Sequence, residues 1–304
     1  MKDKDQISDD ELRNALIRSG YLLETRVARV FQDRSTYVEP SSVYLDPTGE
    51  ASRELDVFAM DGTEVSNIGY IFSVHLVECV NNPQPFALFT YTAAHLEYFA
   101  PQRLHYAGLP IKIHNRKREL PLLEFLAGSK GIPLHYKSGT VATQYCSFKR
   151  KAKNDKEWMA FHEDAHFGSI HALCSAVEHR AKLYYDGFRR GPKEKLNIEF
   201  YYPILVLQGP LLTVKQTPDF HISPAEHAGL LQTTFFGQRE QSYQIDVVTE
   251  EYLPSLLDTI RQEQQTIAEM IRDRRRQIMR AVTIISAALD APNANARQIM
   301  ELSK

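Results

Sequence analysis

The sequence of 304 residues predicts an α/β protein in which helices flank a mixed β-sheet. Three observations favour this class. A β-hairpin pattern near the N-terminus is followed by a continuous apolar run of β-branched and aromatic residues, typical of a buried strand. Helical patterns lie near both ends of the chain and around residues 162–185. Short β-rich runs lie between the helical patterns in the sequence, so predicted strands and helices alternate along the chain.

The first elements are helical and then hairpin-like. Residues 9–31 carry apolar side chains at helical spacing, interrupted at Ser19-Gly20, which predicts one helix or two short ones. Two β-rich pieces, Thr36–Leu45 and Arg53–Met60, are separated by a turn that contains Pro47 and Gly49. This arrangement predicts a hairpin.

The run Ile68–Val80 is too short and too continuously apolar for an amphipathic helix, so we expect a strand buried on both faces. The signals at residues 85–155 are mixed: a short strand, a possible helix at 120–126 and clusters of basic residues. We interpret this segment as an insertion. A long helix is expected from about Trp158 or His162 to Tyr185, ended by Gly187.

The second half is rich in strands, the first of them Ile198–Leu207. Residues 253–289 show one apolar seam at a spacing of three and four, typical of a long helix. The seam either covers the protein's own sheet, the interpretation we favour, or forms a homodimer. We therefore expect a domain at 1–250 with the insertion at 85–155, followed by a long C-terminal helix and tail at 251–304.

Composition excludes several classes of protein. No apolar run reaches the roughly 18 residues that a membrane span needs. The N-terminus is polar and acidic, unlike a signal peptide, and we expect a cytoplasmic protein. Lys and Arg number 36 against 38 Asp and Glu, so the overall charge does not favour nucleic-acid binding. Three cysteines, odd in number and far apart, indicate buried thiols and no disulfide framework.

Acidic residues stand out in the first third of the chain. Asp56 lies between Leu55 and Val57, and Glu78 lies between Val77 and Cys79. Ionised carboxylates in buried strands are costly unless they are paired or bound to a metal. Carboxylates at the ends of neighbouring strands can share one Mg²⁺ ion, which prefers one or two carboxylates plus water and phosphate oxygens. We expect these two residues on adjacent strands and on one side of the sheet.

The stretches GYLLETRVARVF, YVEPSSVYLDPTGEASRELDVFA, HLVECVNNPQPFALF and, later, YYPILVLQGPL resemble the PD-(D/E)XK, or restriction-endonuclease-like, nuclease superfamily. The resemblance covers about the first 90 residues well and the rest loosely. It implies a restriction-endonuclease-like fold in which Asp56 and Glu78 bind Mg²⁺ or Mn²⁺, with Glu24 as the helix acid that assists the metal. It further implies hydrolysis of DNA phosphodiesters, in a bacterial restriction, defence or repair setting.

The sequence departs from the family pattern at one position. Two residues after the Glu, on the same face of the strand, the family has a lysine and this chain has Val80. A cation there orients the attacking water and stabilises charge on the phosphate, and valine does neither. Either Asn81, Asn82 or Gln84 substitutes for the lysine, or the site is degenerate. The alternative function is a non-catalytic nucleic-acid-binding or scaffold protein on the same fold.

A second motif, His162-Glu163-x-x-His166, matches the pattern of a zinc metallopeptidase helix. Asp164 introduces a charge into the motif. The next histidine, His171, projects about 140° away from His166 on a straight helix. We therefore expect no zinc at these histidines and place the metallopeptidase third.

Basic clusters supply the direct indication of nucleic acid. They are expected in loops around the core, where Lys and Arg contact phosphates and position a duplex; the alternative is an ordinary solvated surface. The candidate residues are Arg116, Lys117, Arg118, Lys149, Arg150, Lys151, Arg189 and Arg190.

Overall fold

The computed structural model describes residues 7–47, 49, 51–92, 103–109, 112–115, 118–128, 132, 134–136, 140–151, 156–161, 164–188, 195–215 and 219–289. Its helices are α1 Asp9–Ser19, α2 Tyr21–Gln32, α5 Leu122–Ala127, α6 Asp164–Phe188, α7 Leu253–Asp273 and α8 Arg275–Leu289. Its strands are β1 Tyr37–Leu45, β2 Ser52–Val65, β3 Gly69–Val80, β4 Phe86–Thr92, β5 His105–Leu109, β6 Lys112–Asn115, β7 Arg118–Pro121, β8 Thr140–Arg150, β9 Trp158–Phe161, β10 Leu196–Leu207, β11 Leu211–Lys215, β12 His221–Ala225, β13 His227–Phe236 and β14 Arg239–Thr249.

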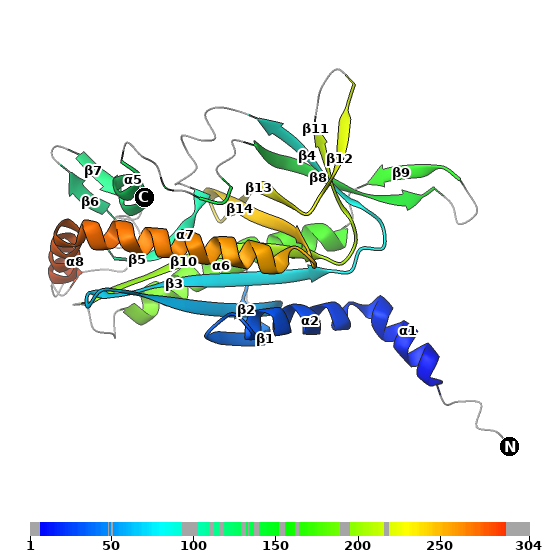
Figure 1. Ribbon diagram of the computed structural model, residues 1–304, viewed down its shortest axis with the longest axis horizontal. Helices are drawn as coiled ribbons and strands as arrows, with labels where there is room; N and C mark the ends of the chain where they lie inside the picture. The colour runs from blue at the N-terminus through cyan, green and yellow to red at the C-terminus, as the bar shows by residue number, and fades with distance from the viewer. Residues whose placement is uncertain are drawn as a thin grey trace.

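The protein is an α/β structure built on one large mixed sheet (Figure 1). Twelve strands belong to this sheet, and its main path runs β1-β2-β3-β10-β14-β13-β8-β4-β11-β12. Strands β1, β2 and β3 form an antiparallel meander, and β10 pairs in parallel with β3 along its whole length. The predicted hairpin and the predicted buried strand are both confirmed.

Helices cover both faces of the sheet around β3 and β10. One apolar cluster joins Val77 and Ile204 to residues of α2 and α7, and a second joins Leu76 and Leu205 to residues of α6. Neighbouring positions on one strand thus belong to opposite cores, as the alternation of side chains requires. This is why β3 and β10 read as continuous apolar runs.

The N-terminal helical region is divided in two at the residue where the sequence pattern is interrupted. Gly20 has a φ of 88°, a left-handed conformation that glycine adopts without a steric penalty, and it ends α1 and begins α2. Ser8 caps α1 and forms a reciprocal capping box with Glu11. The two-helix alternative is therefore the one found.

Three expectations need correction. Trp158–Phe161 forms strand β9 against β8, so the following helix begins at Asp164. The long C-terminal helix is two helices, because the chain leaves helical geometry at Arg274. The segment 85–155, expected as an insertion, supplies β4 and β8 to the large sheet, where the two strands pair with each other.

The apolar seam of the C-terminal helices packs inside the protein's own core. The seam residues that the core contains are Leu257, Ile260, Ile267, Ile271 and Ile278. These five side chains therefore cover the sheet, as the favoured interpretation has it. Figure 1 shows α7 lying lengthwise over the sheet.

Candidate functional site

The two principal acids lie on neighbouring strands. Strand β2 pairs with β3 in antiparallel register, and the last paired residues before the strands separate are Val57 and Val77. Asp56 precedes Val57 and Glu78 follows Val77, so the two acids occupy the first step beyond the paired region. The expectation that Asp56 and Glu78 lie on adjacent strands is confirmed.

Strand β2 departs from regular alternation at Asp56. Its neighbour Leu55 packs in the α6 core while Val57 packs in the α2 and α7 core, although residues two apart on a strand ordinarily share a face. The strand therefore turns at Asp56. The Asp56 carboxylate accepts a hydrogen bond of 2.7 Å from the backbone N–H of Cys79, in the place of a ladder partner. Asp56 lines a cavity beside α2 while Glu78 points toward α6, so the expectation that both acids point to one side of the sheet is wrong. This geometry counts against a metal ion shared by the two carboxylates, and so against the nuclease assignment.

Glu78 points toward α6, where it accepts a hydrogen bond from Ser169. Its side chain is only 8% exposed. Burial, followed by the negative charge of Asp56, raises the pKa of Glu78 to about 9 despite the bond from Ser169. At neutral pH the apo protein thus holds Glu78 in its protonated form.

Glu24 lies in the first turn of α2 and, with Asp56, lines a cavity of about 610 Å³ between α2, β1 and β2. Burial, and then the charges of Asp56 and Glu54, raise the pKa of Glu24. Ser41 lines the same cavity with a φ of 55°, a backbone conformation rare outside glycine that is often found at functional sites.

The acids act on one another electrostatically. Burial and the charge of Glu54 raise the pKa of Asp56, and the bond from Cys79 only partly offsets this. The charges that raise the pKa values of Glu24, Asp56 and Glu78 are those of other carboxylates. We call Glu24, Glu54, Asp56 and Glu78 the acid cluster. Sequence reasoning missed Glu54, although its position two residues before Asp56 was available as a signal.

The acid cluster is not a preformed cage for a metal. Among the residues that the structure describes, no three His, Cys, Asp or Glu side chains converge as metal ligands.

The position of the family lysine is apolar. Val80 packs in the α6 core on the same face as Glu78 and is 8% exposed. The amide of Asn81 donates to the carbonyl of Ile17, at 3.1 Å.

The side-chain amide of Asn82 is engaged in two hydrogen bonds to backbone groups. Its Nδ2 donates to the carbonyl of Gln84, and its Oδ1 accepts from the N–H of Gly209. A Cβ at Gly209 would lie 2.0 Å from the Asn82 carbonyl oxygen, so only glycine fits there. Asn81 and Asn82 thus serve structural contacts, which leaves the side chain of Gln84 as the remaining candidate of the three.

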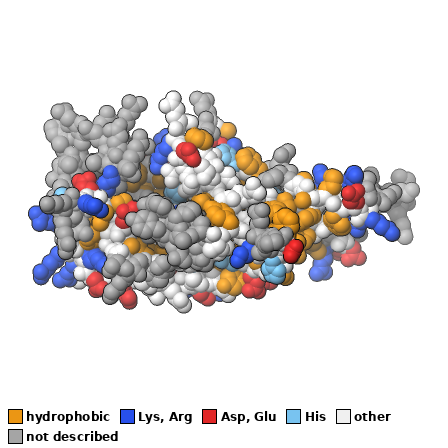
Figure 2. All heavy atoms as spheres, turned by 90° about the horizontal axis from the view of Figure 1, so that it is seen from above, with side chains coloured by type: hydrophobic (Ala, Val, Ile, Leu, Met, Phe, Trp, Pro, Cys, Tyr) orange, Lys and Arg blue, Asp and Glu red, His pale blue; other side chains and the backbone are white. Residues whose placement is uncertain are grey.

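Of the candidate basic residues that the structure describes, Lys151 lies in the bend after β8, as expected, and the other three lie on strand ends, where loops were expected. Lys149 and Arg150 end β8, and Arg118 begins β7. Arg116, Lys117, Arg189 and Arg190 lie outside the described residues. Figure 2 shows Lys and Arg side chains toward both ends of the face drawn, with hydrophobic and acidic side chains between them.

The β8–β9 hairpin carries its own aromatic partners for these cations. The Lys149 ammonium lies 4.3 Å from the Phe161 ring centroid, and the Arg150 guanidinium lies 4.7 Å from that of Trp158. Lys151 forms an ion pair with Glu157 at 3.2 Å. Trp158 is 46% exposed, so this hairpin presents an aromatic ring as well as positive charges to solvent.

Of the second motif, the structure describes His166 and not its two partners. His166 is buried, lies against the Phe86 ring, and shares a hydrogen bond of 2.9 Å with the Ser147 hydroxyl. His162 and Glu163 lie outside the described residues.

A buried ionic network, which the sequence analysis did not foresee, lies on the α7 face. His135 contacts Asp246 of β14 and Glu263 of α7, both at 2.9 Å, and His227 contacts Asp246 at 2.9 Å. Burial alone would lower the pKa of His135, but the two carboxylates raise it to about 10. Asp246 within the apolar run of β14 was the available signal.

Comparison of the chain with protein-family models, with curated proteins and with solved structures finds no match. Within the described part of the chain, none of the helices combines the length and the apolar character that crossing a membrane requires.

Proposed function

We propose that this protein is a divalent-metal-dependent nuclease, or a catalytically weakened relative of one, that acts on DNA. The observation that supports this proposal most is the acid cluster. Burial raises the pKa values of three acids from α2, β2 and β3 near the point where two strands separate, and the charges of Asp56 and Glu54 add to this for Glu24 and Glu78, and that of Glu54 for Asp56. A divalent cation relieves such repulsion.

The order of the elements also favours a restriction-endonuclease-like fold. An acid-bearing helix precedes a hairpin with Asp56, the next strand carries Glu78 two residues before its end, and β10 joins that strand in parallel. This succession agrees with the resemblance of the sequence to the PD-(D/E)XK superfamily. The bacterial restriction, defence or repair setting rests on that resemblance alone.

In this proposal Asp56 and Glu78 would hold Mg²⁺ or Mn²⁺ beyond the last paired residues of β2 and β3, with Glu24 assisting from the cavity beside α2. The placement of the two acids on different sides of the sheet weighs against this arrangement and in favour of the second candidate below. The bound ion would activate water and stabilise charge on a phosphodiester oxygen. The N–H of Cys79 fixes the Asp56 carboxylate, and Ser169 orients Glu78 from α6. The cavity of about 610 Å³ gives water and phosphate access to Glu24 and Asp56.

A non-catalytic nucleic-acid-binding or scaffold function is the second candidate, and a further observation favours it. The lysine position holds the buried Val80, and the side chains of Asn81 and Asn82 are engaged elsewhere. A site without this cation lacks a transition-state contact whose loss costs about 10²–10³ in rate.

Cleavage assays with purified protein separate the two candidates. We expect Mg²⁺- or Mn²⁺-dependent cleavage of plasmid or single-stranded DNA that both Asp56→Asn and Glu78→Gln abolish. Asp258→Asn, an exposed acid on α7, is the matched control and should cleave as the wild type does. DNA binding without cleavage under any metal would favour the binding function. Cleavage that persists in both site variants would refute the proposed centre.

A further inference from the structure

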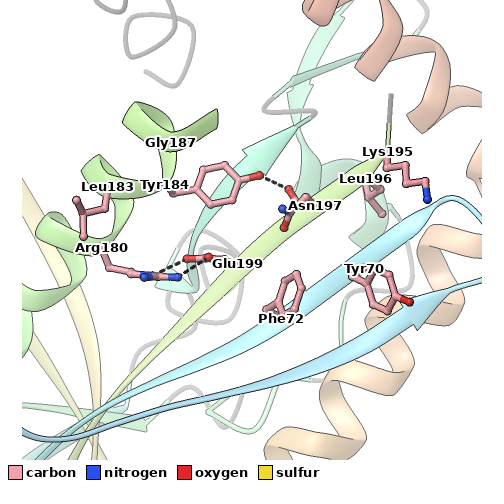
Figure 3. Close-up of a pocket in the computed structure, with 10 residues that line it drawn as sticks. All are labelled: Tyr70, Phe72, Arg180, Leu183, Tyr184, Gly187, Lys195, Leu196, Asn197 and Glu199. Atoms are coloured by element: carbon pink, nitrogen blue, oxygen red, sulfur yellow. Dashed lines mark hydrogen bonds and ion pairs between the residues drawn. The ribbon is translucent and has the colours of Figure 1, made fainter. Parts of the chain in front are cut away.

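A second cavity lies at the opposite end of β3 from the acid cluster (Figure 3). Its volume is about 380 Å³, within the range of small-molecule sites. Tyr70 and Phe72 of β3 face it from one side, and Leu183 and Tyr184 of α6 face it from the other, across the first residues of β10. Eight residues along β3 separate Tyr70 from Glu78, about 26 Å in an extended strand.

Aromatic rings form one wall of this cavity. The rings of Tyr70 and Phe72 are stacked, with centroids 6.1 Å apart and planes at 28°. Tyr70 is 47% exposed, so its ring stands open toward the cavity mouth. Gly62 lies opposite Phe72 on β2, and a Cβ there would lie 3.1 Å from Phe72 Cε1. The glycine thus leaves room for the Phe72 ring to lie against the backbone.

The opposite wall is fixed by hydrogen bonds. The Tyr184 hydroxyl donates to the carbonyl of Asn197, which holds that ring at the edge of the cavity. A planar ligand between the Tyr70–Phe72 pair and the single ring of Tyr184 gains stacking energy on its faces, and this contact is the main attraction of base-binding sites.

Charged groups lie at both ends of the cavity. The Arg180 guanidinium binds Glu199 through Nε and Nη2, at 2.9 and 2.8 Å. This ion pair is neutral overall. Lys195 lies exposed at the other end, beside Tyr70, and adds one positive charge to the rim. The cavity therefore combines aromatic walls, a polar but neutral inner end and a cationic rim.

We propose that this cavity binds a nucleotide, with the base between the aromatic walls and the phosphate at Lys195. The base is planar and carries donors and acceptors that suit the Arg180–Glu199 pair. The phosphate is an anion that suits an exposed ammonium. The separation from the acid cluster makes this a distinct site, so the proposal does not rest on the nuclease function.

Titration calorimetry of the full chain tests the proposal with AMP, GMP, CMP and UMP, together with adenosine and inorganic phosphate as partial ligands. We expect at least one mononucleotide to bind with a Kd below about 1 mM. Lys195→Gln should weaken the nucleotide about tenfold and leave adenosine unchanged. Tyr70→Ala should weaken the nucleotide and adenosine alike.

Lys182→Gln is the matched control, because it removes the same charge from an exposed position of α6 that does not line the cavity. Both Tyr70 and Lys195 are surface residues, so their variants should fold, and circular dichroism verifies this. Absence of binding by all four nucleotides would overturn the proposal. Binding that Lys195→Gln and Tyr70→Ala leave unchanged, or that Glu78→Gln abolishes, would place the nucleotide elsewhere and overturn it as well.

Discussion

Replacement of Glu78 by Gln should make the metal-free protein more stable at neutral pH. The pKa of Glu78 is raised from 4.5 to about 9, so the folded protein binds a proton at pH 7 that the unfolded chain releases. A raised carboxyl pKa lowers the free energy of unfolding above pH 4.5, and the loss grows until the pH reaches about 9. At pH 7 the pH lies about 2.5 units above the ordinary pKa of 4.5. Burial of Glu78 therefore lowers the free energy of unfolding by about 3 kcal/mol at this pH.

The assay is urea unfolding of wild type and Glu78→Gln in EDTA at pH 5 and pH 8, followed by circular dichroism. The Gln amide has nearly the same shape and no charge to bury, so the stability gain should be large at pH 8 and small at pH 5. Added Mn²⁺ should stabilise the wild type and not the variant, because a ligand that binds only the folded state raises its stability. Glu240→Gln, at an exposed position of β14, makes the same substitution and controls for the change of charge.

A result would refute this reasoning if Glu78→Gln were equally stable or less stable than wild type at both pH values. Such a result would mean that the Glu78 carboxylate is paired or solvated in the folded protein. The acid cluster would then carry no electrostatic strain for a metal to relieve.

The remaining predictions concern the lysine position, the buried network and the basic hairpin. Val80→Lys should raise Mg²⁺-dependent DNA cleavage from none to detectable if the site is degenerate, and Glu78→Ala in that background should remove it; if the wild type already cleaves, the new lysine should add little. The contribution of His135, whose pKa is raised to about 10, is present below its ordinary pKa of 6.5 and is lost as the pH rises through 10. Wild type should therefore lose more stability than His135→Gln between pH 8 and 10.5 in urea titrations, and parallel curves would contradict the ionic network. Double replacement of Lys149 and Arg150 by Gln should weaken DNA binding and reduce the slope of log K against log salt by about 2, and an unchanged slope would exclude this hairpin from the interface.

Local elements could be predicted because their signals are local. The turn between β1 and β2, the continuous apolar run of β3 and the break at Ser19-Gly20 each act through neighbouring residues. The membership of β4 and β8 in the large sheet could not be predicted in this way, because pairing partners lie far apart in sequence. β4, for example, pairs with β8 and with β11, which begins at Leu211.

In the candidate site, too, the sequence predicts which residues are unusual and does not predict features that depend on residues far away along the chain. Asp56 and Glu78 could be selected because charged residues inside apolar strands are conspicuous. The direction of Asp56 could not be predicted, since it depends on a change in the alternation of β2 between Leu55 and Val57. The buried network of His135 brings together residues more than 100 positions apart, which no spacing rule detects.

The His135 network and the acid cluster have opposite electrostatic balances, and this contrast bears on their roles. In the network, a protonated His135 lies between Asp246 and Glu263, so each charge has a partner and the contacts hold α7 on the sheet. In the acid cluster, burial and the charges of neighbouring carboxylates raise the pKa values of Glu24, Asp56 and Glu78. The His135 network is balanced without a ligand. The acid cluster lowers the stability of the folded protein at neutral pH, and in the proposed function a bound cation offsets this cost.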